Sequence, residues 1–101
     1  MDYAIETSDH EGVARLKGRL IFTEHSTMRT LIKELSQSSA KRQVLVLEDL
    51  EFIDSAGIGM LLIAKEELTK GGKEFILRRA NGQVQRVLKV AQLGRLITLE
   101  E

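Results

Sequence analysis

The chain has 101 residues, the length of one ordinary domain, so we expect a single domain over residues 1–101. It carries 15 basic and 15 acidic side chains and no cysteine, which excludes disulfides, thiolate metal sites and a cysteine nucleophile. The balanced charge argues against a nucleic-acid binder that depends on overall basicity. The first residues lack the regions of a signal peptide, and no apolar run approaches the about 20 residues of a membrane span, so we expect a cytoplasmic protein that binds no membrane. We also expect that it binds no metal and no cofactor.

The first half of the chain predicts a hairpin, a helix and a buried strand. Weak alternation over 3–7 and clear period-two alternation over 13–20 predict two strands, joined by a polar turn over 8–12 into an antiparallel hairpin. A helix opening at 23–26 is indicated by apolar residues at i, i+3, i+4 and i+7, namely Met28, Leu31, Ile32 and Leu35. The continuous apolar run over 44–47 predicts a strand buried on both faces of a helix-covered sheet.

The second half predicts two further strand–helix units. An acidic loop over 48–54 leads into a helix over 55–70, which Gly71 and Gly72 terminate. A buried strand follows over 74–77, then a helix, then a short strand over 96–99; the helix is indicated by Val84, Val87, Leu88 and Ala91. The order ββαβαβαβ predicts an α/β fold with a mainly parallel sheet, an N-terminal antiparallel hairpin, and helices packed on the sheet.

The segment from the end of the central strand into the second helix carries the strongest functional signal. Either Asp54 or Ser55 is suited to cap this helix. Its helical wheel predicts one sheet-facing stripe, with Ile63 pointing away from it; the stripe consists of Gly57, Met60, Leu61, Ala64 and Leu68. Two glycines near a helix start each cost about 1 kcal/mol relative to alanine, which indicates either close packing on the protein's own sheet or close approach of a partner.

The run Asp54-Ser55-Ala56-Gly57, within residues 52–62, resembles the signature of the STAS family, the sulfate transporter and anti-sigma factor antagonist domains. The resemblance extends over essentially the whole chain, because Gly18-Arg19-Leu20, the strand over 44–47 and Gly71-Gly72 also resemble family features. The bacterial anti-sigma factor antagonists are the most similar group. The resemblance therefore implies a single STAS-type domain.

In such antagonists, the serine after the aspartate is phosphorylated by an anti-sigma factor that is also a serine kinase. The unphosphorylated form binds this anti-sigma factor and releases the sigma factor, and a serine phosphatase resets the phosphorylated form. The resemblance thus implies that Ser55 is the phosphoacceptor. It also implies a partner-binding surface around it, formed by Asp54, Ala56, Gly57, Ile58, Gly59 and Leu62 together with Phe22 and Thr23, whose loop lies near the motif in the family fold.

The distribution of charge along the chain fits such a switch. A phosphate adds a charge of about −1.5 to −2, and it would join carboxylates that already crowd the segment, namely Glu48, Asp49, Glu51 and Asp54. Residues 73–95 contain six basic side chains and one acidic one. They lack interleaved aromatic residues, so we interpret them as a solvated face or a contact for an acidic partner rather than a nucleic-acid patch.

Two alternatives remain open. A STAS scaffold or accessory subunit, in a signalling or lipid-transport complex, would bind a partner constitutively through the same helix, with Ser55 acting only as a cap. A small hydrolase would use Ser55 as nucleophile and His25 as base, but the Gly-x-Ser-x-Gly elbow is absent because Ile53 occupies its first glycine position. We predict that the protein is not an enzyme and does not bind nucleic acid directly.

Overall fold

The computed structural model describes all 101 residues and contains one five-stranded sheet with three α-helices. The strands are β1 (Asp2–Thr7), β2 (Glu11–Leu20), β3 (Arg42–Ile53), β4 (Glu74–Arg78) and β5 (Thr98–Glu100). The helices are α1 (His25–Gln37), α2 (Ser55–Lys70) and α3 (Gly82–Val90), with short 3₁₀ turns η1 (Phe22–Glu24) before α1 and η2 (Leu93–Arg95) after α3. The predicted order ββαβαβαβ and the α/β class are confirmed.

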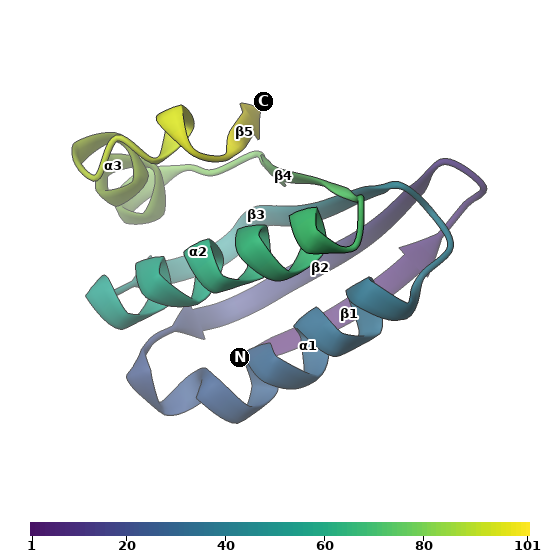
Figure 1. Ribbon diagram of the computed structural model, residues 1–101. Coiled ribbons are helices and arrows are strands. Elements are labelled where there is room, and N and C mark those ends of the chain that lie inside the picture. The colour runs from purple at the N-terminus through teal and green to yellow at the C-terminus, as the bar shows by residue number, and fades with distance from the viewer.

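The strands lie in the sheet in the same order as in the chain, β1-β2-β3-β4-β5. The pair β1–β2 is antiparallel and the remaining pairs are parallel, as the sequence predicts. Because each parallel strand joins its immediate neighbour through a crossover of the same hand, all three helices lie on one face of the sheet. Figure 1 shows α1 and α2 side by side across this face, with α3 beyond β4 near the C-terminus.

The main hydrophobic core lies between this face and the helices. Its 20 buried residues come from β2, β3 and β4, from all three helices, and from the segment between α3 and β5. The largest of them is Phe75 of β4. The stripe predicted for α2 is confirmed, since its buried residues are Gly57, Met60, Leu61, Ala64 and Leu68. Ile63 is exposed, also as predicted. The buried face of α2 therefore follows from helical periodicity.

The strand over 44–47 is buried on both faces, as predicted, but helices cover only one face of the sheet. On the other face, Val44 and Val46 of β3 and Ile76 of β4 form a small separate buried cluster. Charged side chains of neighbouring strands surround it, with Arg42 and Arg78 as the cations. Long aliphatic stems of such residues can cover apolar surface while their charged ends stay in water.

Ion pairs on this helix-free face connect four strands. Arg42 pairs with Glu11, Glu74 and Glu100 at 3.3, 3.2 and 3.0 Å. Arg78 pairs with Glu11 at 3.2 Å and with Glu100 at 2.9 Å. Hydrogen bonds from the Arg78 guanidinium hold the pKa of both glutamates below its ordinary value. The network therefore joins β2, β3, β4 and β5 on the face that no helix covers.

The predicted acidic loop over 48–54 is mostly strand, because β3 continues to Ile53. Opposite β2, this part of β3 contains an extra residue at two points: Arg15 and Lys17 pair with Val46 and Asp49, and Gly18 and Arg19 pair with Leu50 and Phe52. Such bulges interrupt the alternation of side chains between the two faces. The buried residues Leu47, Leu50 and Ile53 are consequently spaced by three, and the period-two signal of a strand is lost.

Smaller differences concern the ends of elements. α1 is preceded by η1, where the sequence predicts the start of one continuous helix, and β5 begins at Thr98 rather than at residue 96 because η2 occupies Leu93–Arg95. No helix of the structure is both long enough and apolar enough to span a bilayer.

Candidate functional site

Asp54 is the N-cap of α2 and also holds the preceding loop in place. Its Oδ1 accepts a hydrogen bond from the Gly57 amide at 2.8 Å, which satisfies one of the free donors of the first helical turn. Its Oδ2 accepts a second hydrogen bond, from the Phe22 amide at 3.1 Å. Its own amide donates to the Leu20 carbonyl at 3.3 Å. The predicted proximity of the Phe22–Thr23 loop to the motif is therefore confirmed, and Asp54 is the residue that joins them.

Ser55 is the first residue of α2 and is exposed to solvent. Because Asp54 performs the capping, the Ser55 hydroxyl has no hydrogen-bond partner in the protein. The interpretation of Ser55 as a plain cap is therefore wrong. A free hydroxyl at a helix N-terminus is accessible to an enzyme, and the local dipole and free amides favour an anion there.

Gly57 and Gly59 lie in opposite surroundings. A Cβ at Gly57 would overlap the carbonyl oxygen of Leu20 and lie 2.6 Å from a side-chain carbon of Ile53, so only glycine allows α2 to approach β2 this closely. Gly57 is buried, so packing within the fold explains this glycine without a partner. A Cβ at Gly59 would have no neighbour within 4 Å. Packing on the sheet therefore explains the first glycine but not the second.

The remaining predicted partner residues divide into exposed and half-buried groups. Phe22 and Thr23 are exposed, Phe22 by 67%. Ala56, Ile58 and Leu62 are half-buried and their apolar side chains also contact the core. Around Ser55, the most exposed large apolar side chain is thus that of Phe22, contributed by η1 rather than by α2.

Two side chains at the site were not selected from the sequence. Phe52 is 36% exposed at the end of β3, and the Arg19 guanidinium lies 5.4 Å from its ring centroid. Phe52 belongs to the motif, but the sequence does not show that its side chain points outward, because that direction depends on the bulges in β3. Gln83 of α3 is the second: its side-chain amide donates to the Ile53 carbonyl at 2.9 Å and accepts from the Ile53 amide at 3.0 Å.

Gln83 replaces a missing neighbouring strand. Pairing between β3 and β4 ends at Val46 and Arg78, so the last seven residues of β3 extend beyond β4. The side chain of Gln83 satisfies the backbone at Ile53, and that of Asn81 donates to the Glu48 carbonyl at 2.9 Å. The start of α3 therefore fixes the end of β3 immediately before Asp54 and Ser55.

The charge around the site is less segregated in space than along the chain. Glu48 pairs with Arg79 at 3.3 Å, and Lys17 of β2 lies opposite Asp49 in the sheet. The expectation of one acidic and one basic region is thus only partly met, because basic residues from β2 and from the turn after β4 lie beside the acidic ones. Glu51 makes no ion pair, and the carboxylate of Asp54 makes only the two hydrogen bonds described above.

His25 does not contact Ser55. Its ring lies edge-on to that of Phe22, with the centroids 5.5 Å apart. No hydrogen bond joins the imidazole to the serine hydroxyl, so the structure lacks the nucleophile–base pair on which the hydrolase interpretation depends.

Comparison with known proteins agrees with the fold and the motif. The profile of the STAS domain family matches residues 2–101. The anti-sigma F factor antagonist of Paenibacillus polymyxa is 30% identical over 105 residues, which cover 98% of this chain and 87% of that protein. The chain therefore belongs to the STAS domain family, and the resemblance seen in the sequence is confirmed.

Solved structures share the same architecture. The anti-sigma factor antagonist SpoIIAA in its unphosphorylated form superposes with a TM-score of 0.74 at 24% identity, covering 99% of this chain and 88% of that one. The phosphorylated form of the Bacillus SpoIIAA gives 0.71 at 24% identity, over 97% and 90% of the two chains. Both forms of that protein thus have the fold described above.

Proposed function

We propose that this protein is an anti-sigma factor antagonist controlled by phosphorylation of Ser55. The unphosphorylated form binds an anti-sigma factor that is also a serine kinase, which releases the sigma factor, and a serine phosphatase restores the binding form. The protein is a substrate of these enzymes rather than an enzyme itself, and it acts in the cytoplasm without binding DNA. Its relationship to the P. polymyxa antagonist supports this proposal.

The observation that carries the proposal is the unpartnered, exposed hydroxyl of Ser55 next to a fully engaged Asp54. Phosphorylation of a serine that capped the helix would replace the hydroxyl that makes the structural hydrogen bond. Here the cap is supplied by the neighbouring residue, so phosphorylation adds charge without removing a structural contact. The switch then needs no change of fold.

The partner surface of the proposal consists of Phe22, Thr23, Ala56, Ile58, Gly59 and Leu62, with Asp54 holding its two segments together. Gly59 offers bare backbone and Phe22 offers an exposed ring beside Ser55. A partner packed on this surface would cover Ser55. After phosphorylation it would have to desolvate a dianion that lies close to the carboxylates of Glu51 and Asp54 in the chain, which opposes binding.

The test combines phosphorylation with affinity. We expect the cognate kinase and ATP to add one phosphate to the parent protein, and none to Ser55→Ala, when intact mass is measured. We expect Ser55→Asp to weaken binding to the anti-sigma factor at least about tenfold, equivalent to about 1.4 kcal/mol. The matched control is Ser39→Asp, which adds the same charge at an exposed serine of the α1–β3 connection.

Two outcomes would reject the switch. If phosphate appears on Ser55→Ala as readily as on the parent, the acceptor lies elsewhere. If Ser55→Asp binds with the affinity of the parent, the surface binds constitutively, as expected of a scaffold or accessory subunit.

A further inference from the structure

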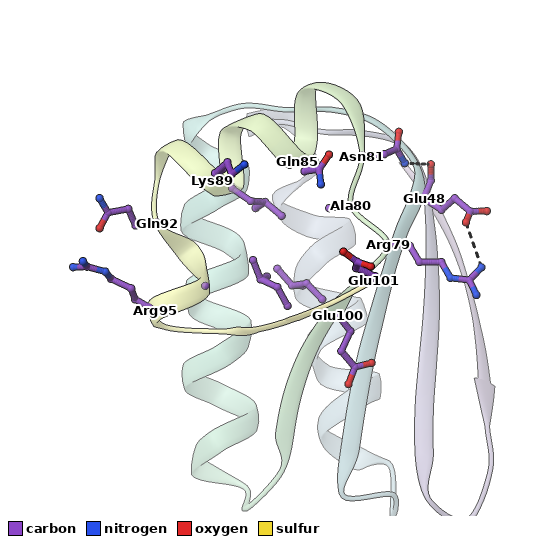
Figure 2. A pocket seen from close by; sticks show the side chains of 14 residues that line it. Glu48, Arg79, Ala80, Asn81, Gln85, Lys89, Gln92, Arg95, Glu100 and Glu101 are labelled. Atoms are coloured by element: carbon purple, nitrogen blue, oxygen red, sulfur yellow. Dashed lines mark hydrogen bonds and ion pairs between the residues drawn. The ribbon is translucent and has the colours of Figure 1, made fainter.

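A second concave surface lies between α3 and β5, away from Ser55. Its cavity has a volume of about 740 Å³, within the range of specific binding sites. Leu77 and Leu88 form a buried apolar floor, and Leu99 of β5 lines it while remaining 44% exposed. Figure 2 shows the polar side chains that line the cavity, among them Gln85, Lys89 and Arg95.

Two further apolar side chains in the same part of the chain are exposed, although they do not line the cavity. Val90, at the end of α3, is 85% exposed, and Leu96, between η2 and β5, is 57% exposed. Together with Leu99, they are three of the six large exposed apolar side chains of the protein, and all three lie in ten consecutive residues. Exposed apolar side chains that gather in one segment of a chain are typical of a contact with a protein partner.

The charges on the rim that are free to interact are mainly positive. Arg79 is engaged by Glu48, and Glu100 by Arg42 and Arg78. Lys89 and Arg95 line the same cavity and make no ion pair. Arg86 of α3 is also exposed and unpaired, although it does not line the cavity. Glu101 is the one acidic lining residue without a cation partner.

We propose that this α3–β5 groove docks an acidic peptide segment of a protein partner, with a leucine-sized side chain in the cavity and carboxylates against Lys89 and Arg95. The apolar floor supplies the anchor site and the unpaired cations supply charge complementarity. None of these residues belongs to the surface around Ser55, so the groove provides a second contact that does not depend on the phosphorylation state. It also gives a role to the basic residues of 73–95 that the Ser55 site does not use.

The test uses the whole chain and a fluorescein-labelled octapeptide composed of glutamate, aspartate and two central leucines. We expect saturable binding by fluorescence anisotropy. In ¹⁵N-labelled protein, we expect the largest amide shift changes at Leu77, Leu88, Gly94 and Leu99. An octapeptide with the same leucines but lysine and arginine as charged residues should bind at least about tenfold more weakly.

Charge-reversal variants locate the contact. The double variant Lys89→Glu/Arg95→Glu should weaken binding of the acidic peptide at least about tenfold, since both side chains are unpaired and exposed and their replacement leaves the fold intact. The matched control Arg29→Glu/Lys33→Glu makes the same charge change on exposed, unpaired residues of α1 and should bind like the parent. Ser55→Asp should also bind the peptide like the parent.

Several results would overturn the proposal. They are absence of saturable binding at millimolar peptide, shift changes that map outside the groove, and equal binding of the acidic and basic peptides. Shift changes in the groove with decanoate but not with the acidic peptide would assign the cavity to a small amphiphile and would equally reject a protein partner.

Discussion

The inner and outer sides of the first turns of α2 differ in the substitutions that they tolerate. On the inner side, Gly57 lies against the Leu20 carbonyl with no room for a methyl group. On the outer side, Ser55 and Gly59 face open space. Asp54 lies between them and binds both the helix and the Phe22 loop. One short motif therefore contains residues required by the fold and residues that the fold does not require, and substitutions can separate the two.

The largest effect is expected on the inner side, from Gly57→Ala. The added methyl group would overlap a backbone carbonyl, which cannot rotate away as a side chain can. We expect the free energy of unfolding to fall by about 3 kcal/mol, the upper part of the usual range for overpacking. Urea denaturation measures it. A variant as stable as the parent would show that α2 can move away from β2 at little cost.

The next largest effect is expected from Asp54→Ala, which removes the cap and the contact with the Phe22 amide. We expect a loss of about 1–2 kcal/mol in the free energy of unfolding. Asp54→Asn separates the two roles, because asparagine caps helices as well as aspartate but has only one acceptor oxygen. It should retain most of the stability; if it loses as much as Asp54→Ala, the contact with the loop is the dominant role.

On the outer side, Gly59→Ala should act in the opposite direction to Gly57→Ala. With no neighbour to obstruct the methyl group, alanine should stabilise the helix by about 1 kcal/mol. Thermal unfolding measures the gain. The same variant should bind the anti-sigma factor more weakly if a partner approaches this backbone, and unchanged affinity would remove Gly59 from the proposed surface.

The smallest change in stability is expected from Ser55→Asp. The hydroxyl makes no contact to lose, and a carboxylate at a helix N-terminus is mildly favourable. We expect the free energy of unfolding to change by less than about 0.5 kcal/mol. A larger loss in chemical denaturation would mean that reduced partner binding by this variant reflects a disturbed fold rather than charge.

Helical periodicity was sufficient to predict the buried face of α2, down to the outward direction of Ile63. It was sufficient because one regular helical repeat places all the buried residues of α2 on the same face. The second half of β3 was predicted as a loop because two extra residues break the alternation that identifies a strand. The apolar run over 44–47 correctly predicted a strand buried on both faces, but such a run does not reveal that one face has no helix on it.

The candidate site was predictable where its residues are adjacent in sequence and not where they are distant. Asp54 and Ser55 were identified by the motif, although which of them caps the helix required the geometry. Gln83 lies 30 residues from the backbone that it binds, and no local pattern marks a side chain that substitutes for a strand. The role of Gly57 was open between packing and partner contact, and a single close approach to Leu20 decides it for packing.

The sequential order of the strands has a consequence for how the chain folds during synthesis. Each new strand can add to the edge formed by the strand made just before it, so no segment has to wait for a distant one to emerge from the ribosome. The contacts of Asp54 with Leu20, Phe22 and Gly57 are complete once the first turns of α2 have been translated. The loop that precedes Ser55 can therefore assemble first, and Gln83 then secures it from a later part of the chain.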